Sequence, residues 1–205
     1  MKHSFGIGPL VLVGGLCLTL CVSPGRGAES MTLGNGEITA DFDAAGLVRV
    51  SLAKSGHALS LAGDSTSITV DGQTLSVRDL ERTGLAQRGQ SVVYTYAAGE
   101  RRLEVIYELK PGWQFISKQI ALILPPQSAC RLDTVEGLRI EAGTPIAREH
   151  RASNASGAVF LRLGRSDPAP GLGACLVLQN PFLKWQRQDA RISMSYSPDL
   201  EWRAS

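Results

Sequence analysis

Apolar and polar residues alternate with a period of two along most of the chain after Asn35. The clearest runs occupy residues 38–42, 48–52, 68–70, 75–77, 92–96 and 103–109. Shorter runs follow at 138–140, 159–163, 175–178, 182–186 and 191–196. This pattern is typical of antiparallel strands that bury one face and expose the other. Asp71 and Gly72 separate two of the runs and predict a tight hairpin.

The stretch from Trp113 to Leu124 breaks this simple alternation. Trp113 and Phe115 share one parity, whereas Ile120, Leu122 and Leu124 share the other. Two interpretations fit. A β-bulge near residues 117–119 rotates the strand, or the strand is buried on both faces. Two consecutive prolines end the stretch.

The remaining local signals favour an all-β fold. No stretch of twelve residues combines a helical period with helix caps. The chain has 22 glycines and 10 prolines, which indicates many turns. Residues 142–157 and 164–173 are predicted to be loops. The sequence therefore predicts an antiparallel β-sandwich, and 205 residues suit one domain, placed at 28–205.

The N-terminal segment has the pattern of an export signal. Lys2 is followed by an uncharged stretch from Phe5 to Val22 and then by small residues around Gly25 and Gly27. This order predicts a signal peptide over residues 1–27, a mature chain that starts at Ala28, and a periplasmic or extracellular location. The alternative is an uncleaved anchor, because the stretch is near the lower length limit for a membrane span. After cleavage, no membrane association is expected.

Charge argues against a nucleic-acid partner. The chain has 21 basic and 19 acidic residues, and two of the basic ones, Lys2 and Arg26, lie in the predicted signal. The mature part is therefore neutral, and its longest basic run is Arg101-Arg102. Nucleic-acid binding requires a concentrated basic surface.

Only two cysteines remain outside the predicted signal, Cys130 and Cys175. In an oxidising compartment they are candidates for a disulfide bond. The alternative is two free thiols, each packed as a small buried apolar residue. There is no CxxC motif and no histidine near either cysteine. The sequence therefore predicts no metal site, and nothing in it predicts a cofactor.

Motifs for catalysis are absent from the sequence. His57 lies near a turn, and Glu149 and His150 are neighbours whose side chains would point to opposite faces of a strand. Glu104 and Glu108 share one strand face, and further acidic residues lie around the next predicted strand, namely Asp133, Glu136 and Glu141. We interpret these groups as the polar face of a sheet and a solvated loop. No catalytic residue is assigned.

The three tryptophans are the candidate carbohydrate-binding residues. They are Trp113, Trp185 and Trp202. An indole ring can stack on the apolar face of a pyranose, although most tryptophans in folded proteins are largely buried. Trp113 follows a Pro-Gly turn, which favours partial exposure.

The order of the strands resembles a known family. The segments that carry this resemblance are 35–43 with 46–52, the pair 103–109 and 113–124 joined by Lys110-Pro111-Gly112, and the later segments 180–184 and 196–202. They resemble galactose-mutarotase-like supersandwich domains, in particular the N-terminal domain of secreted α-galactosidase-like (melibiase-like) glycoside hydrolases.

The resemblance implies a carbohydrate-associated domain without catalysis of its own. In that family a (β/α)8 barrel follows the sandwich and carries the catalytic carboxylates, whereas this sequence stops at Ser205. We therefore expect either a non-catalytic sandwich from an exported glycoside hydrolase, truncated before the barrel that would be its partner, or a free-standing exported binding or structural module without enzymatic activity. Carbohydrate is the candidate ligand.

Overall fold

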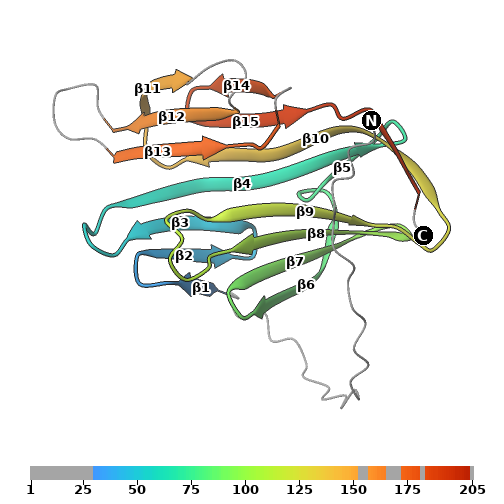
Figure 1. The fold of residues 1–205 in the computed structure, drawn as a ribbon, viewed down its shortest axis with the longest axis horizontal. Helices are drawn as coiled ribbons and strands as arrows, with labels where there is room; N and C mark the ends of the chain where they lie inside the picture. The colour runs from blue at the N-terminus through green and yellow to red at the C-terminus, as the bar shows by residue number, and fades with distance from the viewer. Residues whose placement is uncertain (1–29, 152–156, 165–171, 181–182, 204–205) are drawn as a thin grey trace, which may run out of the picture.

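The computed structural model describes residues 30–151, 157–164, 172–180 and 183–203, which form sixteen β-strands and no helix (Figure 1). All the strand pairs are antiparallel. The predicted all-β, antiparallel, sandwich-like fold is therefore confirmed, and its sheets are open rather than closed into a barrel. The predicted signal peptide lies outside the described residues.

The largest sheet has nine strands. Its main path runs β1 (Met31–Gly34), β2 (Ile38–Asp43), β3 (Gly46–Leu52), β4 (Ala58–Val70), β10 (Ala129–Ala142), β15 (Arg191–Tyr196) and β14 (Lys184–Gln188). Two short strands lie off this path: β5 (Gln73–Ser76) pairs with β4, and β16 (Leu200–Arg203) pairs with β10. The long strands β4 and β10 cross the middle of the molecule (Figure 1).

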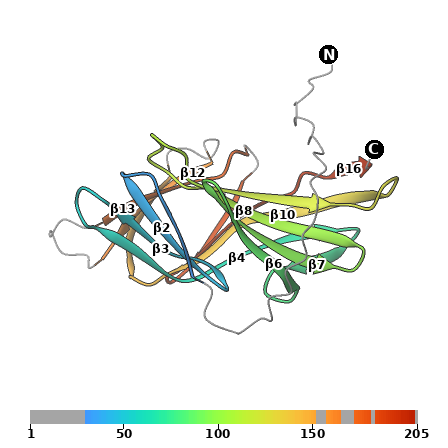
Figure 2. The ribbon, with the colours of Figure 1, turned by 90° about the horizontal axis from the view of Figure 1, so that it is seen from below.

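Two smaller sheets complete the fold. The four-stranded sheet contains β6 (Glu81–Arg88), β7 (Ser91–Ala98), β8 (Arg101–Glu108) and β9 (Ser117–Ile123) in sequence order. The three-stranded sheet contains β11 (Ile146–Arg151), β12 (Ala158–Leu163) and β13 (Leu172–Val177). Figures 1 and 2 place these two sheets at opposite ends of the long strands.

Bulges keep the buried residues of the long strands on one face. Leu61 and Asp64 of β4 are both buried although their positions differ by an odd number, and the same holds for Val135 and Ile140 of β10. The pairing of β4 with β10 shifts register between these residues in each strand. One extra residue in a bulge restores the parity, so the same face stays turned inward. Simple alternation in the sequence could not reveal this.

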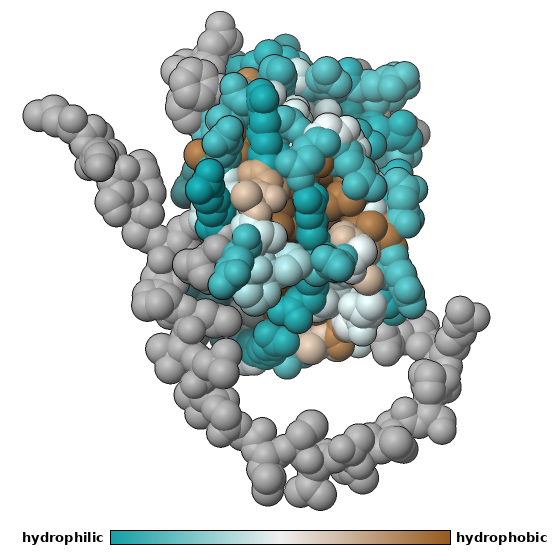
Figure 3. Space-filling view, turned by 90° about the vertical axis from the view of Figure 1, so that its right-hand side faces the viewer, coloured by the Kyte–Doolittle hydropathy of each residue, from teal (hydrophilic) through white to brown (hydrophobic). Residues whose placement is uncertain are grey.

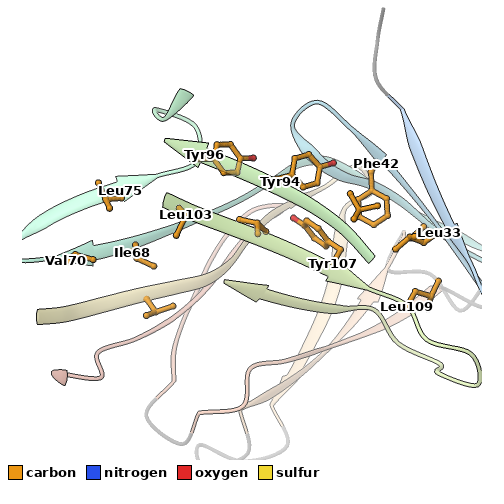
Figure 4. Close-up of a cluster of buried hydrophobic side chains, with 14 of the residues drawn as sticks. Leu33, Phe42, Ile68, Val70, Leu75, Tyr94, Tyr96, Leu103, Tyr107 and Leu109 are labelled. Carbon is orange, nitrogen blue, oxygen red and sulfur yellow. The ribbon is translucent and has the colours of Figure 1, made fainter. Parts of the chain in front are cut away.

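The inward face supports two hydrophobic cores. The larger core lies between the four-stranded sheet and β1, β2, β4, β5 and β10, and its side chains point toward one another in Figure 4. Phe42, Tyr94 and Tyr107 are its central rings, with ring centroids 5.1 Å apart for Phe42 and Tyr107 and 5.9 Å apart for the two tyrosines. The smaller core lies under the three-stranded sheet and includes Leu161, Ile192 and others. Each small sheet therefore closes one half of the nine-stranded sheet.

Several sequence-based assignments need correction. Residues 142–157 were expected to form a loop, but β11 occupies Ile146–Arg151. Strand β6 was not predicted, because its residues are half-buried or exposed and do not alternate clearly. The hairpin at Asp71 and Gly72 is confirmed, since both residues have positive φ angles (53° and 76°) that suit a tight turn.

The parity change after Trp113 has a third explanation. Residues 113–116 form a loop, and β9 begins only at Ser117. Its pairing with β8 runs without interruption from Ser117 to Ile123, so the strand contains no bulge. The two parities belong to two different structural elements. The bulge interpretation was therefore wrong, whereas residues 120–123 are half-buried on both faces of the strand.

Candidate functional site

The structure does not bring the three tryptophans together. Trp113 lies in the loop between β8 and β9, Trp185 lies in β14, and Trp202 lies in β16. Strand β14 belongs to one edge of the nine-stranded sheet, whereas β16 extends from the far end of the molecule (Figures 1 and 2). They are three separate positions rather than one aromatic site.

Trp113 belongs to an aromatic stack that the sequence analysis found only in part. Its ring packs against Phe115 with the centroids 4.5 Å apart and the planes at 18°. The ammonium of Lys110 lies 5.0 Å from the Trp113 ring centroid. Trp113 is half-buried, whereas Phe115 is 56% exposed. Because Trp113 is already contacted by both neighbours, Phe115 is the more open ring of the stack.

Asn35 fixes the loop that carries this stack. Its side-chain amide donates hydrogen bonds to the carbonyl oxygens of Lys110 (2.9 Å) and Trp113 (2.7 Å). Its side-chain oxygen accepts from the backbone N–H groups of Glu37 (3.0 Å) and Ile38 (2.9 Å). One amide thus uses both donors and its acceptor to join the β1–β2 turn to the β8–β9 loop. The aromatic stack is held in place before any ligand arrives.

The other two tryptophans have different surroundings. Trp185 packs against the smaller core beside Arg151, whose guanidinium lies 5.8 Å from the ring centroid. Its buried Nε1 has no hydrogen-bond partner among the described residues. Trp202 is 47% exposed and lies next to Cys130 on the paired strand. Of these two, only Trp202 is open enough for a ligand to reach the ring easily.

Cys130 and Cys175 are both free thiols. Cys130 is buried in β10 opposite Trp202, and Cys175 is exposed in β13 opposite Phe160. They belong to different sheets, and β13 and β16 lie at opposite ends of the molecule (Figure 2). The disulfide considered from the sequence is therefore not formed in this structure. The alternative of two buried thiols holds for Cys130 alone.

The acidic residues considered for catalysis lie in ordinary ion pairs. Glu104 and Glu108 point outward from β8 and pair with Arg102 and Lys110, each at 3.3 Å. Further pairs join Asp133 to Arg131, Glu136 to Arg139, Glu141 to Arg191, and Glu149 to Arg151 and Arg187. His57 is exposed, and His150 follows Glu149 in β11. These contacts agree with our interpretation of Glu104 and Glu108 as part of a polar sheet face.

A buried polar cluster connects the two facing sheets. Asp64 of β4 accepts hydrogen bonds from the Tyr107 hydroxyl, from Lys118 Nζ (2.7 Å) and from the backbone N–H of Leu47 (3.3 Å). Lys118 also donates to the carbonyl oxygen of Ser65 (2.9 Å). Gly46 is required beside them, because its φ is 135° and an added Cβ would lie 3.3 Å from Asp64 Oδ2. The cluster joins β3, β4, β8 and β9.

Burial strongly affects the tyrosines of this region. Desolvation raises the pKa of Tyr107 well above its usual value, and the charge of Asp64 raises it further. Desolvation also raises the pKa of Tyr94 and Tyr96. The Tyr94 hydroxyl donates to the carbonyl oxygen of Asp43 (2.6 Å). The raised pKa values keep these hydroxyls protonated at neutral pH, and those of Tyr94 and Tyr107 donate hydrogen bonds.

An apolar groove opens beside the buried cluster, at the free side of β9. It has a volume of about 230 Å³. Its lining combines Lys118, Ile120 and Leu122 of β9 with residues of the nine-stranded sheet and the segment after β13, namely Ile68, Leu132, Val135, Gly137, Leu178 and Tyr196. Lys118 is the single charged residue in the lining, and Asp64 neutralises it.

A second cleft, of about 460 Å³, lies where the β4–β5 and β7–β8 turns approach residues 125–128. Its charged residues include Asp71 and Arg101, which pair at 2.6 Å. The hydrogen bonds from the Arg131 backbone and from Arg101 lower the pKa of Asp71. Figure 3 views the side of the molecule that lies at the right of Figure 1, where apolar side chains appear among a majority of hydrophilic ones. Asp71 is thus held by a cation, and Glu100, the other acidic residue of the lining, is exposed to solvent.

No group of three or more histidine, cysteine, aspartate or glutamate side chains is arranged to hold a metal ion within residues 30–151, 157–164, 172–180 and 183–203. Over the same residues, no helix is long and apolar enough to cross a membrane.

Sequence reasoning missed Phe115, the Asp64 cluster and the groove. Phe115 stands two residues after Trp113, and this spacing was a signal that could have found the stack. Asp64 and Lys118 are far apart in the chain, and no local pattern connects them. Comparison with known proteins gives no further guide, because no family model, curated protein or solved structure matches the chain.

Proposed function

We propose that this protein is an exported, non-catalytic binding domain that binds carbohydrate through the Trp113–Phe115 stack. The observation that carries the proposal is the exposed face of Phe115 on a loop fixed by Asn35. An exposed aromatic side chain on a rigid loop loses little conformational freedom when a ligand binds.

The chemistry of the stack suits a sugar ring. A pyranose has an apolar face of C–H groups that packs on an aromatic ring, while its hydroxyls need hydrogen-bond partners at the rim. The exposed Gln114, which adjoins Phe115 in the chain, and the ammonium of Lys110, which lies over Trp113, are polar groups that could act as such partners. The site is an open surface, so we expect weak binding, strengthened when several sugar units or several domains act together.

The surroundings of the acidic residues support a role without hydrolysis. Glycoside cleavage requires two carboxyl groups across one bond, with one of them kept protonated. Glu104 and Glu108 instead point outward from a sheet, each beside a cation. The resemblance to the N-terminal domains of secreted glycoside hydrolases supports the same role, since a separate barrel performs the catalysis there.

The test is binding to a panel of insoluble polysaccharides and soluble oligosaccharides, measured by pull-down and by tryptophan fluorescence. Phe115→Ala should weaken the binding about tenfold, as expected when a central aromatic contact is lost. Asn35→Asp should weaken it too, because the aspartate keeps the acceptor for Glu37 and Ile38 but loses both donors to the loop.

Trp202→Ala is the matched control, because Trp202 is also an exposed aromatic residue but belongs to β16, far from this loop. It should leave binding unchanged. Failure to bind any carbohydrate in the panel would overturn the proposal. Binding that depends on Trp202 and not on Phe115 would assign the sugar to a different surface.

A further inference from the structure

The strand β9 forms an edge of the four-stranded sheet. Among the described residues it pairs with β8 alone, so alternate N–H and C=O groups along Ser117–Ile123 point away from β8 without a strand partner. Folded proteins usually protect such an edge with charges, prolines or bulges. From Gln119 to Ile123 the edge contains none of these.

The apolar groove lies directly beside this free edge. Lys118, Ile120 and Leu122 are alternate residues of β9, and they form one wall of the groove. The other wall comes from Leu132 and Val135 of β10, and from Leu178 and Tyr196. In the nine-stranded sheet, β10 lies between β4 and β15, and β15 ends at Tyr196. A strand added to β9 would therefore lie over the groove with its alternate side chains pointing into it.

We propose that the β9 edge and its groove bind an extended, neutral, apolar segment of another protein by adding it as a fifth strand. Backbone hydrogen bonds to β9 would provide affinity, and the groove would select small or medium apolar residues at alternate positions. This site is separate from the Trp113–Phe115 stack and does not depend on it.

Charge and size both select this occupant. The single charge in the groove lining, on Lys118, is neutralised by Asp64 at 2.7 Å, so an anionic ligand gains no uncompensated cation. The groove volume of about 230 Å³ is below the usual range for small-molecule pockets, about 300–1,000 Å³. The space suits a row of a few side chains rather than a whole ligand.

The probe for the test is a fluorescent, end-capped peptide of alternating valine and threonine, as long as the seven residues of β9. We expect saturable binding in fluorescence anisotropy. We also expect slower amide hydrogen exchange at alternate residues within 119–123, since N–H groups that have no strand partner in the free protein become hydrogen-bonded. A peptide N-methylated at alternate residues keeps every side chain but loses one row of hydrogen bonds, and should bind about tenfold more weakly or worse.

Two substitutions locate the site on the protein. Leu178→Glu puts a charge into the groove and should abolish the binding. Val177→Glu, at an exposed position one residue earlier that is not part of the groove lining, should leave it unchanged. Thermal unfolding verifies that both variants fold. If Leu178→Glu fails to fold, the N-methylated peptide still tests the proposal with the unchanged protein.

Several results would overturn the proposal. Equal binding of the N-methylated peptide would assign the groove to a small apolar ligand. Dimers in sedimentation experiments that disappear with Leu178→Glu would assign the edge to a second copy of this chain. Absence of saturable binding, or protection outside β9, would mean that the edge does not accept a strand of this chemistry. Carbohydrate binding should be the same with and without the peptide.

Discussion

Asp64 Oδ1 accepts a hydrogen bond of 2.7 Å from Lys118 Nζ, and this ion pair joins the nine-stranded sheet to the four-stranded sheet. The two side chains are 2% and 11% exposed. A buried pair of this kind gains little net stability over an apolar pair, but the loss of one partner leaves a buried charge without compensation. This relationship leads to the first prediction.

Lys118→Met should lower the free energy of unfolding by about 3–5 kcal/mol, because Asp64 then remains buried without its cation. Chemical denaturation measures the loss. Lys54→Met is the matched control, since Lys54 pairs with Glu37 at 2.9 Å on the surface with 80% and 38% side-chain exposure. Exposed ion pairs contribute about 0–1 kcal/mol to the free energy of unfolding. Asp64→Asn combined with Lys118→Met should recover part of the loss. Equal effects of the two single lysine variants would contradict the prediction.

Stability should fall as the pH rises above about 10. The folded-state pKa values of Tyr94, Tyr96 and Tyr107 are raised by desolvation, so these residues stay protonated when folded but lose protons near pH 10 when unfolded. The unfolded state then binds fewer protons, and the loss approaches about 1.4 kcal/mol per pH unit for each tyrosine. Tyr107→Phe should reduce the loss of stability per pH unit in this range. Denaturation at several alkaline pH values measures it, and tyrosinate absorbance that appears before unfolding would argue against it.

Gly46→Ala should destabilise the protein by about 1–3 kcal/mol. Gly46 has φ of 135°, and an added Cβ would meet Asp64 Oδ2 at 3.3 Å and the Tyr107 hydroxyl at 3.4 Å. Gly56→Ala is the control for backbone strain alone, because Gly56 has φ of 67° and no neighbour within 4 Å of the added Cβ. Gly56→Ala should lower the free energy of unfolding less than Gly46→Ala does. A larger loss at Gly56 would mean that crowding at the Asp64 cluster is unimportant.

The two thiols should differ in reactivity. Cys175 is exposed and should be alkylated in the folded protein without any reductant. Cys130 is buried, and desolvation raises the pKa of its thiol, so it should react only after unfolding. Peptide mapping by mass spectrometry assigns the label to each cysteine. Two unreactive cysteines that become reactive only after reduction would instead establish the disulfide.

The purified chain should not hydrolyse nitrophenyl glycosides with α or β linkage. Glu104 and Glu108 lie beside Arg102 and Lys110 on the outer side of β8, a poor setting for a carboxyl group that must donate a proton. Glu104→Gln and Glu108→Gln should therefore change neither hydrolysis nor carbohydrate binding. Turnover above the buffer rate that either variant abolishes would restore an enzymatic function.

The sequence by itself determined the class of fold, because a side-chain period of two is a local property. The runs at 38–42, 92–96 and 103–109 all lie in strands, and in the first and last of them the buried side chains share one face. The turn at Asp71 and Gly72 could also be predicted locally, since Asp and Gly are residue types that adopt the positive φ angles of a tight turn. Part of the aromatic stack was also visible, because Trp113 follows a Pro-Gly turn.

Only the tertiary structure decided where these strands pack and which distant residues meet. The bulges in β4 and β10 shift the parity of the buried face, and they depend on pairing between strands far apart in the chain. Asp64 and Lys118 meet across two sheets, and Asn35 reaches a loop about 75 residues away. Hydrogen bonds between residues far apart in the chain leave no periodic signal in a sequence. The groove beside β9 likewise depends on how the two sheets pack, so no local sequence pattern indicates it.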